Sequence, residues 1–122
     1  MKKKRKNQNH IHKKNQSCHD SIVKSLEERL LESNINWVVN TEYIYGGKRV
    51  LGDVDVYATV SSLTTDYLLM IEVKSSDKHK ARQKMRNQLR RAHDYFSENY
   101  DRVFLLYVYR ERKKIKLERV YL

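Results

Sequence analysis

Cysteine, glycine and proline are scarce in this chain of 122 residues, which has one cysteine, three glycines and no proline. A single cysteine, Cys18, cannot form an intrachain disulfide, so a disulfide-stabilised scaffold is excluded. No run of about 18 apolar residues occurs, so the sequence predicts no membrane-spanning helix and no membrane partner. No apolar segment follows the basic N-terminus either, which argues against a secretory signal and makes a cytoplasmic location the expectation.

Acidic residues are also in the minority. The chain has 15 Asp and Glu against 26 Lys and Arg, which gives a net charge of +11 and an isoelectric point near 9.8. A domain this basic is typical of proteins that bind a polyanion, most often nucleic acid. A basic surface that only keeps the protein in solution is the alternative.

Seven of the cations lie in residues 1–16, MKKKRKNQNHIHKKNQ, where Ile11 is the one apolar residue after the initiator. Such a segment buries too little to order itself, so we expect a disordered basic tail at 1–16 and one domain at 17–122. The tail could bind phosphates without sequence preference, or serve as a nuclear address in a eukaryotic host. Near it lie residues that could suggest a metal site, but their spacing fits no closed zinc pattern: His10, His12, Cys18 and His19.

The hydrophobic pattern predicts an α/β domain. Apolar residues repeat at helical spacing from about Cys18 to Ser33 and again over 78–99. Helix, three strands, helix and two strands, in this order, predict a single mixed sheet flanked by two helices. The strands are expected at residues 36–45, 51–60, 67–74, 102–109 and 114–122.

The expected strand at 51–60 alternates in character. Strand geometry predicts Asp53, Asp55 and Tyr57 on one face of the sheet. It predicts Val54 and Val56 on the opposite face.

The strand at 67–74 is apolar on both faces, as a central strand is, yet it ends in Glu72 and Lys74. These two side chains point the same way, and Asp55 can meet them if its strand is the neighbour. Two close carboxylates repel and need a cation, and their oxygens suit Mg²⁺ or Mn²⁺. Lys74 could then activate a water and neutralise charge on a phosphate. These are the parts for phosphodiester hydrolysis; an ordinary Glu–Lys pair beside a surface Asp is the alternative.

Each helix adds one candidate. Glu27 lies within the apolar stripe of the first helix, between Val23 and Leu30, where a carboxylate needs a positive partner. Alternatively it lies at the edge of the stripe and reaches solvent. Gln88 lies on the buried stripe of the second helix, where an amide needs partners, or it packs at that stripe's edge. Basic residues in and just before the second helix are expected to hold the DNA backbone: Lys78, Lys80, Arg82, Lys84, Arg86, Arg90 and Arg91.

The segments GDVDVYA and LLMIEVKS resemble the core of the PD-(D/E)xK, or restriction-endonuclease-like, nuclease superfamily. Asp55, Glu72 and Lys74 match that family's Asp, Glu and Lys, and the expected order of elements resembles its αβββαβ core. With the passage LLESNINWVVN and a basic helix that bears a glutamine, the chain is most similar to archaeal and viral Holliday-junction resolvases.

The resemblance implies a Mg²⁺-dependent endodeoxyribonuclease. Asp55, Glu72 and the carbonyl of Val73 would bind the ion, Lys74 would activate water, and Gln88 would position Lys74 or a phosphate. Branched or duplex DNA needs two cuts and one chain offers one site, so a homodimer on DNA is expected.

The chain also departs from the resolvase pattern. Resolvases carry a glutamate on the first helix, where this chain has Lys24. Glu27 is favoured as its replacement, with Glu28 and Asp20 as alternatives. The basic tail and the loop at 61–66 are further differences. Two other functions stay open: a nonenzymatic nucleic-acid-binding module that keeps the fold, and an RNA-directed nuclease or a subunit of a larger restriction or transposition assembly.

Overall fold

The structure is a computed structural model, which describes the backbone of residues 2–122 and the side chains of residues 16–122. Except for Gln16, the side chains of the expected disordered tail lie outside the described residues, and the disorder stays a prediction. The elements follow in the order α1 (Lys2–Glu32), β1 (Val38–Gly46), β2 (Val50–Ser61), β3 (Asp66–Lys74), α2 (His79–Phe96), the 3₁₀ turn η1 (Ser97–Asn99), β4 (Arg102–Glu111) and β5 (Lys114–Arg119).

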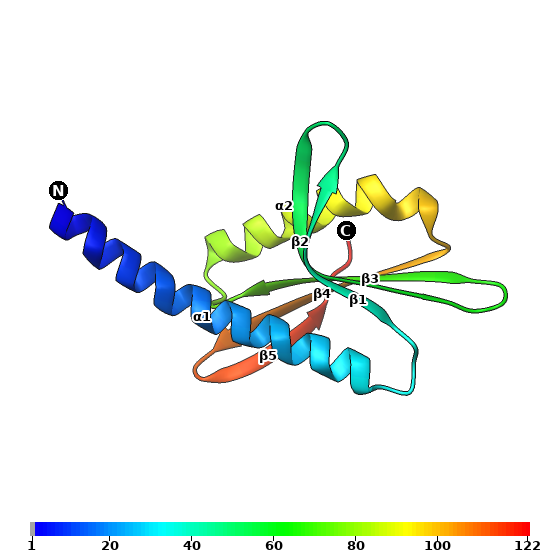
Figure 1. Ribbon diagram of the computed structural model, residues 1–122, viewed down its shortest axis with the longest axis horizontal. Helices are drawn as coiled ribbons and strands as arrows, with labels where there is room; N and C mark the ends of the chain where they lie inside the picture. Colours follow the sequence, from blue (N-terminus) through cyan, green and yellow to red (C-terminus); the bar gives the residue numbers. More distant parts are fainter. Residues whose placement is uncertain (1) are drawn as a thin grey trace.

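The strands form one mixed sheet in the order β1-β2-β3-β4-β5. Neighbouring strands are antiparallel except β3 and β4, which are parallel because α2 carries the chain back between them. One helix covers each face of the sheet (Figure 1). This arrangement confirms the predicted α/β fold, in which two helices flank a single mixed sheet.

An apolar layer lies on each side of β3. On one side, Met85 and Leu89 of α2 belong to the same buried cluster as Met70. On the other side, Ile22 of α1 packs in a second cluster with Ile71. Because neighbouring residues of a strand point to opposite faces, β3 is buried on both faces, as its apolar run predicts.

The strand β2 changes course at Asp55. Its pairing with β3 extends only to Val56, opposite Ile71, and beyond that point the two strands separate. Glu42, which faces this position from β1, has a φ of 51° and is missing from the β1–β2 register. Val54 consequently packs on the α2 side while Val56 packs on the α1 side. The expected placement of these two valines on one face is wrong, because the alternation is interrupted at Asp55.

Beyond this interruption β1 and β2 continue as a two-stranded arm, residues 43–54, which rises beside α2 at the top of Figure 1. Gly46 closes its tip with a φ of 133°, and a Cβ there would collide with the carbonyl oxygen of Arg49. At Gly52 a Cβ would lie 2.6 Å from the hydroxyl oxygen of Tyr45. Gly46 is therefore required by its backbone conformation, whereas a side chain at Gly52 would require the Tyr45 ring to shift.

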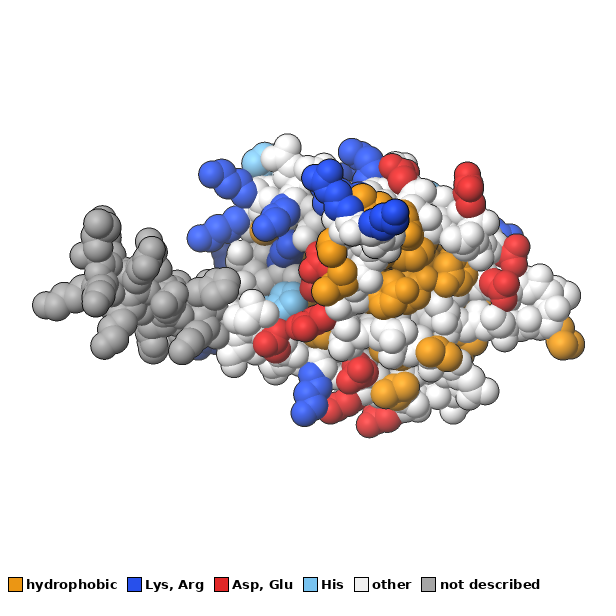
Figure 2. All heavy atoms as spheres, turned by 45° about the horizontal axis from the view of Figure 1, so that its top comes forward, with side chains coloured by type: hydrophobic (Ala, Val, Ile, Leu, Met, Phe, Trp, Pro, Cys, Tyr) orange, Lys and Arg blue, Asp and Glu red, His pale blue; other side chains and the backbone are white. Residues whose placement is uncertain are grey.

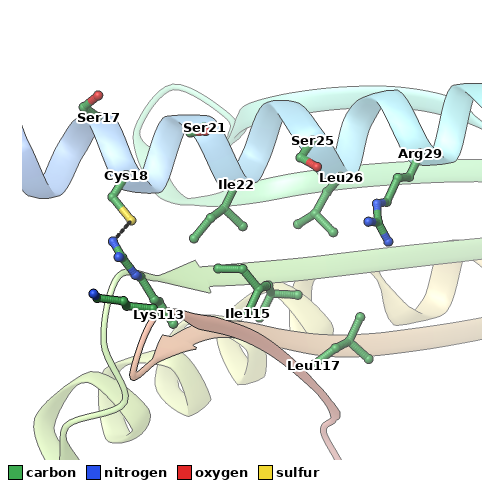
Figure 3. A pocket seen from close by; sticks show the side chains of 12 residues that line it. Ser17, Cys18, Ser21, Ile22, Ser25, Leu26, Arg29, Lys113, Ile115 and Leu117 are labelled. Carbon is green, nitrogen blue, oxygen red and sulfur yellow. Dashed lines mark hydrogen bonds between the residues drawn. The ribbon is translucent and has the colours of Figure 1, made fainter.

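The helix α1 leaves part of its face of the sheet uncovered. A cavity of about 770 Å³ runs between α1 and the last two strands (Figure 3). Ser21 and Leu26 of α1 line one wall, Leu117 of β5 lines the other, and Arg110 and Lys113 add positive charge. Among the described residues no carboxylate lines this cavity, so it lacks the oxygen ligands that the predicted metal chemistry requires.

Candidate active site

A smaller cavity, of about 180 Å³, opens where β2 and β3 separate. Asp55 of β2 lines it together with Glu72 and Lys74 from the end of β3. Gln88 of α2 and His19 of α1 also line it. We call Asp55, Glu72, Lys74 and Gln88 the cavity cluster.

The two carboxylates take the place of backbone partners at the point where the strands separate. The backbone N–H of Val73 donates to Asp55 Oδ2 at 2.8 Å, and the N–H of Asp55 donates to Glu72 Oε1 at 3.3 Å. Each carboxylate thus satisfies a donor of the neighbouring strand. The same separation that opens the cavity therefore also holds both carboxylates beside it.

Glu72 is a buried carboxyl group whose ionised form the protein balances only in part. Among the described residues it is the one buried Asp, Glu, Lys or Arg, with 2% of its surface exposed. Burial, followed by the nearby charge of Asp55, raises the pKa of Glu72 well above its ordinary value, and Lys74 opposes this. The Nζ of Lys74 lies 3.8 Å from Glu72 Oε2, but its hydrogen bond, of 2.8 Å, goes to Gln88 Oε1. A cation beside Glu72 and Asp55 would relieve this imbalance.

The helix α1 brings a histidine to the cavity. His19 Nε2 lies 3.1 Å from Asp55 Oδ1, and its Nδ1 lies 3.3 Å from Asp20 Oδ1. Gln16 Nε2 donates to the same oxygen of Asp20 at 2.9 Å. The hydrogen bond with Asp55 raises the pKa of His19, burial opposes it, and Asp20 adds to the rise. Sequence reasoning named His19 only within a rejected zinc pattern and missed its place beside Asp55, although it lies one helical turn before the buried Val23 and so shares that face of α1.

Glu27 does not line the cavity. It lies roughly two turns, or about 12 Å, along α1 from His19 at a rise of about 1.5 Å per residue. Its side chain is half-buried, and Glu28 beside it is exposed. The structure therefore does not bring Glu27 to the cavity, and the α1 carboxylate connected to it is Asp20, which contacts the ring of His19.

The cavity has two carboxylates and space for water, but no closed set of metal ligands among the described residues. Mg²⁺ commonly uses one or two carboxylates and keeps several waters, and about 180 Å³ is the space of roughly six waters. Within residues 16–122 no three His, Cys, Asp or Glu side chains are grouped closely enough to enclose an ion. Asp55 and Glu72 offer carboxylate oxygens, which are the ligand type of Mg²⁺ or Mn²⁺, and metal binding at this cavity stays a prediction. Val73 lines the cavity, and the ligand role of its carbonyl stays a prediction.

The predicted DNA-binding residues divide between two flanks of α2. Gln88 faces the cavity, whereas Arg86 and Arg90 line a separate hollow of about 340 Å³. On that flank Arg86 donates to the carbonyl of Tyr121 at 3.3 Å. Lys78 precedes the helix and is exposed. Helical spacing instead places three of the other basic residues on the flank of Gln88: Lys80, Lys84 and Arg91.

Arg82 is already paired with two carboxylates of the protein, and the expected phosphate contact stays a prediction. Its guanidinium reaches Asp77 and Glu118 at 2.9 Å, with two hydrogen bonds to each. The Tyr107 hydroxyl donates to Asp77 at 3.0 Å, and the Tyr109 hydroxyl donates to Glu118 at 2.8 Å. The bonds from Arg82 and Tyr109 lower the pKa of Glu118. We call these five residues the Arg82 cluster; it ties the start of α2 to β4 and β5.

Comparison of the chain with protein families, curated proteins and solved structures found no match. The resemblance carried by Asp55, Glu72 and Lys74 therefore depends on the short motifs, and it stays a prediction. Over the part of the chain that the structure describes, neither helix has the length of apolar residues that a membrane crossing needs.

Proposed function

We propose that this chain is a metal-dependent endonuclease of the PD-(D/E)xK type, which hydrolyses phosphodiester bonds in DNA. The observation that carries the proposal is the meeting of Asp55, Glu72 and Lys74, from two adjacent strands, around one cavity. A structural cluster of charges usually neutralises itself, whereas Glu72 is buried and, among the residues whose side chains the structure describes, the one Lys or Arg that it meets is Lys74, at 3.8 Å. The net charge of +11 supports a polyanionic substrate.

The roles follow from the contacts. Mg²⁺ or Mn²⁺, when bound, supplies Lewis-acid polarisation of the phosphate and lowers the pKa of a bound water. Asp55 and Glu72 offer the carboxylate oxygens that would hold it. Lys74 is held through its Nζ by Gln88, so it can donate to the attacking water or to a phosphate oxygen without first being ordered.

His19 is a positioning residue in this proposal. Its ring contacts Asp55 on one side and Asp20 on the other, so it keeps the Asp55 carboxylate hydrogen-bonded while no cation is present. A histidine held by a carboxylate keeps a fixed ring orientation. Asp55 is thereby presented to the cavity in one conformation.

Branched DNA is the proposed substrate, with a homodimer as the acting form. Cutting two strands takes two sites, and the described part of one chain holds one such cavity cluster. The proposed location is on DNA in the cytoplasm, or in the nucleus of a eukaryotic host.

The proposal is tested by incubating the purified chain with labelled four-way junction, duplex DNA, single-stranded DNA and RNA. Each substrate is supplied with Mg²⁺, with Mn²⁺ and with EDTA. We expect cleavage of DNA with either metal, none with EDTA, and none with Asp55→Asn. Binding of DNA without any cleavage would contradict the proposal and favour a nonenzymatic nucleic-acid-binding module.

A further inference from the structure

The arm, residues 43–54, is fixed to the body of the protein by its inner face. The ring of Tyr45 packs against Tyr95 and Phe96 of α2, with centroids 5.0 and 5.1 Å away. Arg91 of α2 donates to the carbonyl of Leu51 at 3.4 Å. These contacts hold the arm in one position beside α2, so its outer face has a defined place relative to the cavity.

The outer face of the arm is apolar and exposed. The register places Ile44 opposite Asp53 and Gly46 opposite Val50, so the side chains of Ile44 and Val50 lie on the same face. They are 65% and 68% exposed, and Leu51 beside them is 46% exposed. Figure 2, in which the top of Figure 1 comes forward, shows hydrophobic side chains gathered in the middle of the side of the molecule that faces the viewer. Adjacent exposed apolar residues on one projecting element are typical of a contact surface.

Positive charge accompanies this apolar surface. Lys48 and Arg49 are exposed at the tip, and residues 44–52 contain no carboxylate. Figure 2 shows Lys and Arg side chains directly above the hydrophobic area, and Asp, Glu and His side chains beside it. Asp53 is the acidic residue on the outer face, and it lies nearer the root of the arm. An apolar surface edged by cations is complementary to a nucleic-acid groove, where sugars and bases lie between two rows of phosphates.

The arm also begins at the candidate site. Asp55 lies at its root, and Val50 is five residues before it in β2, which is about 17 Å at roughly 3.4 Å per residue. Base pairs are also spaced by about 3.4 Å, so this reach spans roughly five base pairs, or half a turn of duplex. A duplex with one phosphate at the cavity can therefore meet the tip of the arm half a turn away.

We propose that the outer face of the arm is a DNA-contacting surface, in which Lys48 and Arg49 hold phosphates while Ile44 and Val50 lie in the adjoining groove. The inference deepens the proposed nuclease function and rests on it. It adds a binding surface that is separate from the cavity cluster. Removal of the arm's contacts should therefore weaken DNA affinity more than it lowers the rate of hydrolysis at saturating DNA.

The apolar contact is tested with the double variant Ile44→Ser/Val50→Ser, and the matched control is Ile115→Ser/Leu117→Ser on β5. The control pair is 55% and 57% exposed, so both variants remove similar apolar surface. Affinity for a labelled duplex is measured by fluorescence anisotropy in EDTA, and thermal unfolding verifies that both variants are folded. We expect the arm variant to bind about tenfold more weakly, on the scale of a few buried apolar groups, and the control to bind as the wild type does.

The ionic contact is tested with Lys48→Ala/Arg49→Ala against Lys113→Ala/Lys114→Ala at the β4–β5 turn. Each phosphate contact contributes about 0.9 to the slope of log affinity against log salt, so the arm variant should lose up to roughly 1.8 of that slope. The control variant should lose less of this salt-dependence slope than the arm variant does.

Two results would overturn the inference: wild-type affinity in both arm variants, or an equal loss in the arm variants and their controls. Because binding is measured without metal, this result is independent of hydrolysis. Weaker binding by the arm variants in a chain that never cleaves DNA would sustain the arm and reject the nuclease. If the wild type cleaves DNA and the arm variants bind it with wild-type affinity, the nuclease proposal is kept and the arm is rejected as a DNA-contacting surface.

Discussion

The cavity cluster and the Arg82 cluster contain the same parts, two carboxylates and one cation, and balance them differently. In the Arg82 cluster one guanidinium contacts both carboxylates at 2.9 Å. In the cavity cluster the Lys74 ammonium is 3.8 Å from Glu72, and its hydrogen bond goes to the neutral amide of Gln88. Two carboxylates and a cation therefore do not define a function until their distances are known.

Side-chain shape and burial explain the difference. The planar fork of Arg82 can bind two carboxylates at once, whereas a lysine is a single point charge. The side chain of Glu118 is 41% exposed, so water shares its charge, but that of Glu72 is 3% exposed. The Arg82 cluster should stabilise the fold, and the cavity cluster should cost stability in return for a place where a cation can bind.

The largest expected effect separates the clusters by activity. Asp55→Asn and Glu72→Gln should each lower metal-dependent cleavage by about three orders of magnitude, because metal-ion stabilisation is worth several kcal/mol. Asp77→Asn should cleave at nearly the wild-type rate per folded molecule. Single-turnover rates at saturating Mg²⁺ and DNA give the comparison. Equal losses at Asp77 and Asp55 would remove the distinction between the clusters.

The second effect separates them by stability. Arg82→Met should lower the free energy of unfolding by about 2 kcal/mol, since it leaves Asp77 and Glu118 without their cation. This loss of stability is only about 2 kcal/mol because Arg82, Asp77 and Glu118 are partly exposed to water. The melting temperature should fall by roughly 8 °C, measured by calorimetry. A stability unchanged from the wild type would show that this cluster is not structural.

The third effect concerns the hydrogen bond that holds Lys74. Gln88→Leu keeps the size of the side chain and removes the acceptor, so the Lys74 ammonium loses its fixed position. We expect the single-turnover rate at saturating DNA to fall by about tenfold, with DNA affinity almost unchanged. A loss of affinity without a loss of rate would instead place Gln88 on the DNA.

The smallest effect concerns the stability that Glu72 costs. Its pKa is raised in the folded state, so its ionisation disfavours folding, and this penalty grows as the pH rises above the ordinary value of 4.5. Without metal, Glu72→Gln should be more stable than the wild type by about 1 kcal/mol near pH 7, and nearly equal to it below about pH 4. Denaturant unfolding at both pH values measures this. A variant less stable than the wild type near pH 7 would show that the charge of Glu72 is satisfied.

Much of the fold could be predicted from the sequence, because hydrophobic periodicity specifies which segments are helices and strands. The apolar run before Glu72 identified a central strand, and strand geometry predicted that Glu72 and Lys74 share a face. The interruption at Asp55 could not be predicted, since it depends on the φ of Glu42 and on the separation of β2 from β3. The alternating sequence of β2 is compatible with a regular strand and with a strand that is interrupted at Asp55.

The choice of His19 over Glu27 as the α1 residue at the cavity could not be predicted either, for a different reason. A stripe of apolar residues shows which face of a helix is buried, but not how far along the sheet the helix lies. His19 and Glu27 both lie near that stripe, and only the docking of α1 brings His19 to the cavity. The Arg82 cluster depends likewise on the register of β5, which places Glu118 opposite Tyr107.

Direct measurement of metal binding tests the central claim, that the cavity cluster and not the Arg82 cluster holds a cation. Electron paramagnetic resonance of Mn²⁺ titrated into the chain without DNA reports bound and free ion, independently of cleavage. We predict one Mn²⁺ bound at up to millimolar concentrations by the wild type and by Asp77→Asn, and none by Asp55→Asn or Glu72→Gln. No bound Mn²⁺ in the wild type, or the same occupancy in all four proteins, would contradict the account.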